Sequence, residues 1–206
     1  MSLRSLTQPS DSNWNVPNGL SFVRLVLAIV VGILIEFHFY LPALVCFVLA
    51  ASTDFIDGWW ARRFKQITKL GRILDPFVDK TIIGAAMIAL VGVPESGFAA
   101  WIVTLVISRE LLVTSLRGMI EGAGGDFSAK QLGKWKMVAQ CAAIIVSLLN
   151  VLQTEPVAWL QWALVLSLIA AVILTLLSGW EYVVLARRSL TQRLSSTADL
   201  GESSSA

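Results

Sequence analysis

The chain has 206 residues, of which 56% are apolar, and its mean hydropathy is +0.72. This composition excludes an ordinary soluble domain of this size and indicates an integral membrane protein. The formal net charge is only +2, but the basic residues are distributed unevenly along the chain.

Six apolar stretches of about 20 residues are each long enough to cross a hydrocarbon core about 30 Å thick. They cover residues 20–40, 41–62, 73–93, 98–116, 132–152 and 157–184. We therefore expect an all-α membrane protein with six transmembrane helices. The expected organisation is an N-terminal segment (1–19), a six-helix domain (20–189) and a Ser-rich, disordered tail (190–206). The N-terminal segment is polar and has no signal-peptide core, so we expect the first span to be retained.

The basic residues predict how the spans are oriented. The connections at residues 40, 93–98 and 153–155 contain no Lys or Arg, whereas the other connections and both terminal segments are basic. Because basic connections stay in the cytoplasm, we expect both termini there and the protein in the inner (cytoplasmic) membrane. The eight tryptophans lie near the ends of the spans, as expected for an aromatic belt.

Four aspartates interrupt the apolar pattern at the cytoplasmic ends of two neighbouring spans. Asp54 and Asp57 lie at the end of the second span, and Asp75 and Asp79 lie at the start of the third. A carboxylate in hydrocarbon costs roughly 2.5–3.5 kcal/mol even on lenient insertion scales, so four close together need compensating positive charge. Two divalent ions bound by carboxylate oxygens, Mg²⁺ or Mn²⁺, would supply that charge.

Small residues beside these carboxylates favour a ligand site over simple ion pairs. Asp54 and Asp57 share one predicted helical face with Gly58 and Ala61, and Gly71 extends the corresponding face of the third span. Small side chains let a ligand approach bound metal closely, whereas ion pairs would not need them. In the ion-pair alternative, the partners of the aspartates would be Arg62, Arg72 and Lys80.

The pattern Asp-x2-Asp-Gly-x2-Ala-Arg-x8-Gly-x3-Asp-x3-Asp resembles the signature of the CDP-alcohol phosphotransferase family at every defined position. Those positions are filled by Asp54, Asp57, Gly58, Ala61, Arg62, Gly71, Asp75 and Asp79. The resemblance implies transfer of a phosphatidyl group from a CDP-linked lipid to an alcohol, with release of CMP. It also implies that the protein is a homodimer.

The resemblance assigns separate roles to these residues. Asp54, Asp57, Asp75 and Asp79 would bind two divalent ions, and Asp79 would also be the general base. The nucleotide and the phosphates of the lipid would be bound by Asn18, Ser21, Arg24, Asp54, Gly58, Ala61, Arg62 and Gly71. An alcohol hydroxyl is a poor nucleophile, so a carboxylate that takes its proton as the P–O bond forms suits this reaction.

The acceptor alcohol must be identified from the remaining basic residues. Arg109 lies about eight residues from the cytoplasmic end of the fourth span, which is costly unless it faces a polar cavity. A guanidinium supported by ammonium groups is a suitable phosphate-monoester site, and the candidate residues are Arg109, Arg117, Lys134 and Lys136. The run 108–117, together with 133–136 and Gln140, looks like the phosphatidylglycerophosphate synthase branch of the family. That resemblance implies CDP-diacylglycerol as the donor and sn-glycerol 3-phosphate as the acceptor.

Two alternatives remain open. An inositol phosphate would suit the same cations, whereas serine would have less need of them. A divalent-cation transporter would need polar groups across the membrane, yet residues 41–49 and 83–93 are apolar. No nucleic-acid partner is expected. His38 is predicted to be an interface residue at the outer end of the first span, and the two cysteines, Cys46 and Cys141, small residues of the core.

Overall fold

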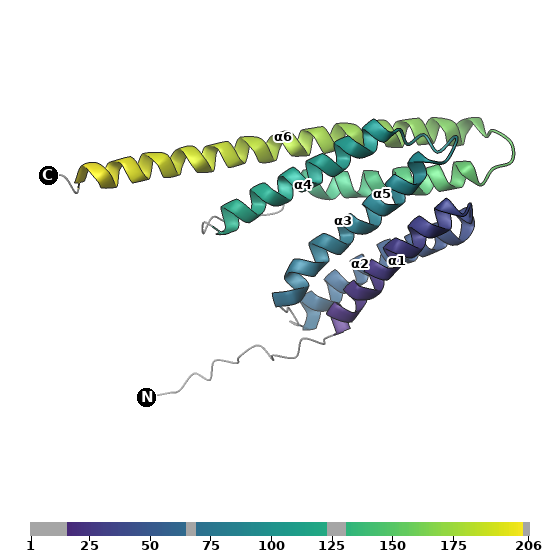
Figure 1. Cartoon of the computed structure of the whole chain (residues 1–206), viewed down its shortest axis with the longest axis horizontal. Helices are drawn as coiled ribbons and strands as arrows, with labels where there is room; N and C mark the ends of the chain where they lie inside the picture. Colours follow the sequence, from purple (N-terminus) through teal and green to yellow (C-terminus); the bar gives the residue numbers. More distant parts are fainter. Residues whose placement is uncertain (1–15, 65–68, 123–130, 204–206) are drawn as a thin grey trace. The chain divides into compact units, whose positions relative to one another are not determined.

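The computed structural model describes the backbone of residues 16–64, 69–122 and 131–203, and the side chains of residues 19, 21–53, 77–118 and 131–187. Six α-helices follow one another in these ranges, and the described residues form no strand (Figure 1). They are α1 (Val16–Glu36), α2 (Tyr40–Phe64), α3 (Lys69–Val91), α4 (Ala100–Gly122), α5 (Gln131–Val151) and α6 (Ala158–Ser203). The prediction of an all-α fold is confirmed.

Prolines and a left-handed residue define the first helix boundaries. Pro17 and Pro42 lie in the first turns of α1 and α2. Backbone N–H groups in a first turn have no acceptor within the helix, so proline, which lacks this N–H, is tolerated there. His38, between the two helices, has a φ of 63°. The N–H of Phe39 donates to the carbonyl of Leu34 at 2.8 Å, which closes the end of α1. The resulting turn is short, so α1 and α2 are neighbours.

The first compact unit comprises Met1–Val93. Within it α1 packs against both α2 and α3, and α2 also contacts α3. The buried face of α1 follows a spacing of three and four residues and contains Ser21, Arg24, Ala28, Val31 and Ile35. The two polar members of that face come first. They therefore lie near the N-terminal end of α1, and the apolar residues of the face follow them along the helix.

The second compact unit comprises Pro94–Ala206, in which α6 contacts both α4 and α5. Side chains of α5 hold the segment that precedes α4. Ser147 Oγ donates to the carbonyl of Ser96 at 2.7 Å, and Asn150 Nδ2 donates to the carbonyl of Glu95 at 3.0 Å. Gly97 has a φ of 75°, and a Cβ there would lie 2.8 Å from Leu168 Cδ1 of α6. This segment therefore needs glycine for both its conformation and its close packing.

Helix α6 differs from the expected boundary because it continues to Ser203. The sequence predicts a Ser-rich, disordered tail from residue 190, whereas the backbone of residues 190–203 is helical. The physical reason is cooperativity: once a helix is nucleated, each further residue adds a hydrogen bond, and no proline follows position 156. The first glycine beyond position 179 is Gly201.

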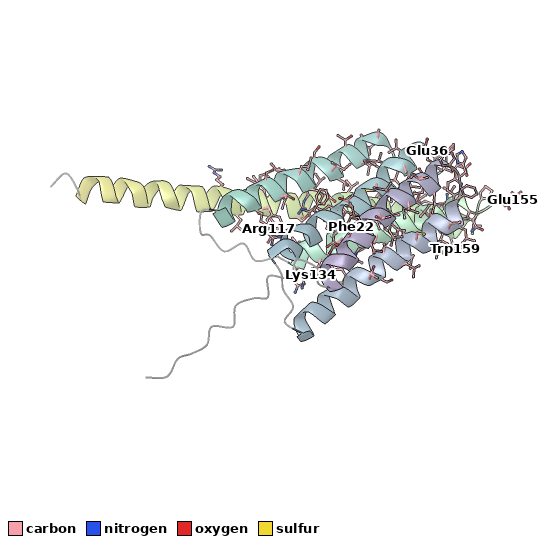
Figure 2. All side chains as sticks on the ribbon, turned by 60° about the horizontal axis from the view of Figure 1, so that its bottom comes forward. Phe22, Glu36, Arg117, Lys134, Glu155 and Trp159 are labelled. Atoms are coloured by element: carbon pink, nitrogen blue, oxygen red, sulfur yellow. The ribbon has the colours of Figure 1, made fainter. Side chains whose placement is uncertain are left out.

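Two helical stretches in the described part of the chain are long and apolar enough to cross a membrane. They are Gln131–Val151 and Ala158–Arg187, while Tyr40–Thr53 of α2 is a shorter apolar stretch. Large apolar side chains also face outward along the helices of both units, among them Phe22 and Trp159 (Figure 2). The five tryptophans with described side chains are all exposed: Trp101, Trp135, Trp159, Trp162 and Trp180.

Candidate active site

An ion pair joins α1 to α3 in the described part of the first unit. Arg24 Nη1 lies 2.7 Å from Asp79 Oδ1. The side chain of Arg24 is only 3% exposed, whereas that of Asp79 is 24% exposed. Arg24 occupies the polar end of the buried face of α1, so packing of the apolar core brings its guanidinium to α3. The partly exposed carboxylate is therefore held from one side and accessible from another.

This contact brings together two residues that the sequence predicts in one site. Arg24 was expected near the nucleotide and Asp79 near the metals, and the proposed ion-pair partners of the aspartates did not include Arg24. Ser21, one turn before Arg24, is 1% exposed and lies on the same face of α1. The structure therefore joins the polar start of α1 to the aspartate-bearing end of α3.

The other predicted residues of this site are described through their backbone alone. Asn18 lies in α1, Gly71 and Asp75 lie in α3, and their side chains fall outside the described residues. The same holds for five residues of α2: Asp54, Asp57, Gly58, Ala61 and Arg62. Among the side chains that the structure describes, no three His, Cys, Asp or Glu residues come together, and three of the four aspartates are not in that set.

The donor set nevertheless fits the implied metal ions. Two aspartates lie three residues apart in α2, two lie four residues apart in α3, and these two helices are in contact. The donors are carboxylate oxygens only, which is the preference of Mg²⁺ and Mn²⁺. The residues present therefore suit hard divalent cations rather than zinc or copper.

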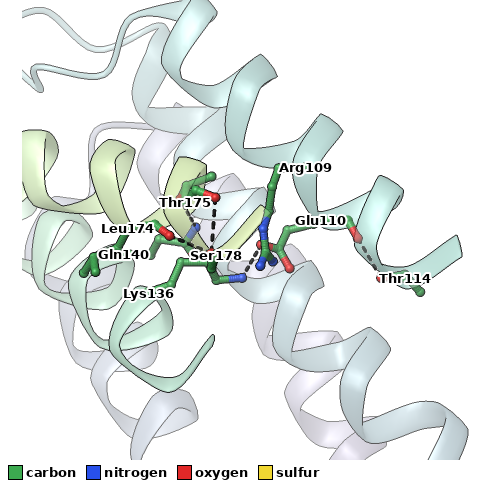
Figure 3. A network of polar contacts seen from close by, with 8 residues as sticks. All are labelled: Arg109, Glu110, Thr114, Lys136, Gln140, Leu174, Thr175 and Ser178. Atoms are coloured by element: carbon green, nitrogen blue, oxygen red, sulfur yellow. Dashed lines mark hydrogen bonds and ion pairs between the residues drawn. The ribbon is translucent and has the colours of Figure 1, made fainter. Parts of the chain in front are cut away.

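A second polar cluster lies in the other unit and joins α4 to α5 (Figure 3). Glu110 Oε1 accepts from Arg109 Nη1 at 3.1 Å and also forms an ion pair with Lys136 Nζ. Arg109 and Lys136 are 9% and 7% exposed. Because two cations share one carboxylate, the cluster has a net charge of +1, held in a largely buried position.

Helix α6 shapes the space around Arg109. The Arg109 guanidinium lies over the ring of Tyr182, with Cζ 5.5 Å from the ring centroid, at a distance typical of a cation–π contact. A Cβ at Gly179 would lie 3.2 Å from Arg109 Cγ, so a glycine here leaves room for the arginine. One turn after Lys136 in α5, Gln140 Nε2 donates to Thr175 Oγ1 of α6 at 3.2 Å, and both side chains are buried.

The Arg109 guanidinium is incompletely satisfied. Its Nε and Nη2 atoms are buried and have no hydrogen-bond partner among the described residues. A buried donor without an acceptor costs about 1–3 kcal/mol, and more when the group is charged. A ligand that brings anionic oxygens to these donors would remove this cost, and a phosphate can bind a guanidinium through two parallel hydrogen bonds.

The structure brings only part of the predicted acceptor site together. Arg109 and Lys136 meet at Glu110, whereas Lys134 is exposed (Figure 2). Residues two positions apart in an α-helix point in directions that differ by about 200° around the helix axis. Lys134 and Lys136 therefore lie on different faces of α5. Arg117 is partly buried two turns after Arg109 on α4.

The contribution of α6 was not predicted, although a sequence signal for it exists. Four small or polar residues interrupt the apolar stretch at positions i, i+3, i+4 and i+7, which is a single helical face. They are Thr175, Ser178, Gly179 and Tyr182. A helix that only anchors the protein in the membrane can be apolar on every face. The small and polar face therefore indicates that α6 contacts a polar cluster.

Comparison with known proteins agrees with this organisation. The family model described as CDP-alcohol phosphatidyltransferase matches residues 14–177. The chain is 35% identical over 184 residues to the CDP-diacylglycerol–glycerol-3-phosphate 3-phosphatidyltransferase of Bacillus subtilis (strain 168), covering 82% of this chain and 93% of that protein. The protein of the same name in Escherichia coli (strain K12) is 33% identical over 190 residues, covering 86% and 97%.

A third relative of that name, from Cereibacter sphaeroides, is 38% identical over 147 residues, covering 67% of this chain and 65% of that protein. The family match begins just before α1 and ends at residue 177 in α6, so it includes the aspartate-bearing helices and the Arg109, Glu110 and Lys136 positions. This chain belongs to the CDP-alcohol phosphatidyltransferase family.

Proposed function

We propose that this protein transfers the phosphatidyl group of CDP-diacylglycerol to sn-glycerol 3-phosphate, giving phosphatidylglycerol phosphate and CMP. The observation that carries the choice of acceptor is the buried Arg109 guanidinium, whose Nε and Nη2 have no acceptor among the described residues. The names of the relatives support the same donor and acceptor. A phosphorylated alcohol would satisfy this guanidinium, whereas an alcohol without phosphate would leave it unpaired.

The proposed enzyme is an inner-membrane protein with six spans, both termini in the cytoplasm and a homodimeric assembly. Two stretches meet the length and composition of a span, and large apolar side chains face outward along the other helices. Outward apolar surface of this extent is stable in lipid but not in water. The basic connections support a cytoplasmic location for the span ends that carry the aspartates.

The aspartates would hold two divalent ions, Mg²⁺ or Mn²⁺. Asp54, Asp57, Asp75 and Asp79 are the proposed ligands, and Asn18, Ser21, Arg24, Gly58, Ala61, Arg62 and Gly71 would contact the nucleotide or the lipid phosphates. When bound, the ions neutralise the diphosphate and stabilise the leaving CMP.

Asp79 is the proposed general base. Its Oδ1 is held by Arg24, and the carboxylate retains partial exposure through which an acceptor hydroxyl could approach. Asp79 would take the hydroxyl proton as the hydroxyl oxygen forms its bond to the lipid-side phosphorus and the bond to CMP breaks. Direct displacement of this kind inverts the configuration at that phosphorus.

Arg109 and Lys136 would bind the phosphate of the acceptor. Their cluster has an excess positive charge, the Arg109 guanidinium lies over the Tyr182 ring, and Gly179 leaves room for the arginine side chain. Arg117 and Lys134 would contribute further positive charge. Since binding the phosphate satisfies buried donors, it should contribute strongly to acceptor affinity.

The test is a CMP-release assay with purified full-length protein and CDP-diacylglycerol. Parallel reactions contain sn-glycerol 3-phosphate, inositol phosphate or serine, each with Mg²⁺ and again after chelation with EDTA. Of the three acceptors, we expect only sn-glycerol 3-phosphate to support CMP release. That release should be lost in EDTA and should return when Mg²⁺ or Mn²⁺ is added back. If CMP release requires inositol phosphate instead, the proposed phosphatidyl transfer stands but sn-glycerol 3-phosphate is the wrong acceptor.

A further inference from the structure

Both cations of the Arg109 cluster bind the same oxygen of Glu110. Arg109 Nη1 donates to Oε1 at 3.1 Å, and Lys136 Nζ pairs with that same atom (Figure 3). These are the contacts that the structure gives to this carboxylate among the described residues. Its second oxygen, Oε2, therefore remains available to accept a hydrogen bond.

The surroundings hold this carboxylate in one orientation. Lys136 is 7% exposed, and Arg109 is 9% exposed with its guanidinium over the Tyr182 ring, so burial restricts the movement of both cations toward the other oxygen. The Glu110 side chain is 15% exposed and not fully enclosed. Oε2 is thus a preorganised acceptor beside a guanidinium that still has two unpaired donors.

This pairing of donors and an acceptor matches a phosphorylated polyol better than a phosphate alone. The phosphate would be repelled by a free carboxylate oxygen but attracted by the cations, so it would take the Arg109 side. A hydroxyl group next to the phosphate-bearing carbon can donate to the carboxylate. In sn-glycerol 3-phosphate the C2 hydroxyl occupies that position, between the phosphate and the C1 hydroxyl that attacks.

We propose that Glu110 is a specificity-determining residue that recognises the C2 hydroxyl of the acceptor through Oε2. The inference rests on the proposed function, because it assigns the acceptor phosphate to Arg109 and Lys136. It adds a second requirement, since an acceptor must carry a hydroxyl beside its phosphorylated carbon as well as the phosphate. Glu110 thereby distinguishes polyol phosphates from simple alkyl phosphates.

The test compares sn-glycerol 3-phosphate with 3-hydroxypropyl phosphate, which has the phosphate and the attacking hydroxyl but lacks the C2 hydroxyl. CMP release is measured with full-length wild-type protein and with Glu110→Gln, Glu110→Ala and the control Glu155→Gln. Glu155 is an exposed acid in the connection between α5 and α6. For wild type we expect kcat/KM to favour sn-glycerol 3-phosphate by about 10- to 100-fold, as is typical of a hydrogen bond to a charged group.

The variants should change this ratio and not only the rate. In Glu110→Ala the two acceptors should become equal within about threefold, and Glu110→Gln should lie between, because a neutral amide binds a hydroxyl more weakly than a carboxylate does. Glu155→Gln should retain the wild-type ratio. A role for Glu110 limited to holding the cations would lower kcat/KM for both acceptors equally and leave the ratio unchanged.

Each result separates this inference from the proposed function. Wild-type protein that uses both acceptors equally would overturn the role of Glu110 while leaving the proposed function intact. Wild-type protein that releases CMP with neither acceptor would overturn both. If Glu110→Ala does not fold, the ratio of kcat/KM for the two acceptors in wild type and in Glu110→Gln still tests the role of Glu110, because the amide preserves the size of the side chain.

Discussion

Asp79 is the residue on which the proposed chemistry depends most directly. The substitution Asp79→Asn retains the shape of the side chain but removes its ability to take a proton. We expect kcat to fall by about 10²- to 10⁴-fold, the usual contribution of a positioned base, while binding of CDP-diacylglycerol persists. Single-turnover CMP release and equilibrium binding of the lipid measure the two effects separately.

The control for Asp79 is Glu36→Gln, which removes the charge of an exposed acid at the other end of α1 in the same unit. It should leave kcat unchanged. Asp79→Asn also deprives the buried Arg24 of its carboxylate partner, so a thermal unfolding midpoint is needed beside the kinetics. A folded Asp79→Asn protein with near-normal turnover would exclude Asp79 as the base.

Arg109 should control acceptor affinity specifically. The change Arg109→Ala removes the guanidinium, so we expect KM for sn-glycerol 3-phosphate to rise by about 10-fold or more, with little change in KM for CDP-diacylglycerol. Arg187→Ala is the matched control because Arg187 is an exposed arginine of α6. If Arg109→Ala leaves the KM for sn-glycerol 3-phosphate unchanged, the acceptor phosphate binds elsewhere.

At the scale of the elements, α6 contributes a surface and not only a span. Its face of small and polar residues leaves the Arg109 side chain room between the helices, and Gly179 is the closest point of approach. Gly179→Ala places a methyl group 3.2 Å from Arg109 Cγ. We expect KM for the acceptor to rise by about 3- to 10-fold, and further in Gly179→Val, because a displaced guanidinium loses its binding geometry.

Gly84→Ala is the matched control for this prediction. Gly84 is also a helical glycine, but a Cβ there meets nothing within 4 Å. Both changes replace glycine by a better helix former, which favours the helix by roughly 0.5–1 kcal/mol. KM should therefore change in Gly179→Ala alone; an equal effect of both changes would show that α6 does not shape the acceptor site.

At the scale of the whole molecule, orientation in the membrane can be tested with reporter fusions. A green fluorescent protein attached after Ala206 should fluoresce, since we expect the C-terminus in the cytoplasm, where that reporter folds. Alkaline phosphatase inserted at Thr154 should be active, since residues 153–155 are expected outside and that enzyme needs an oxidising compartment for its disulfides. An inactive phosphatase at Thr154 together with an active one after Ala206 would show that the orientation is opposite to the predicted one.

The family and most of the fold could be predicted from the sequence because their signals are local. Asp54–Asp79 is a fixed pattern of residue types, and the lengths of the apolar stretches correspond to six helices. The boundaries were less predictable, since helix cooperativity extends α6 to Ser203 beyond its apolar part. Lys134 was grouped with Lys136 because they are close in sequence, whereas the helix directs them to different faces.

By itself, the sequence determined that the chain is all-α, belongs to a family with four aspartates at fixed spacing, and carries a deep arginine in its fourth apolar stretch. Only the tertiary structure decided which side chains meet: Arg24 with Asp79, and Arg109 and Lys136 on one oxygen of Glu110. The reason is that helical periodicity defines the faces of each helix, whereas partners 26 or 55 residues apart are chosen by packing between helices.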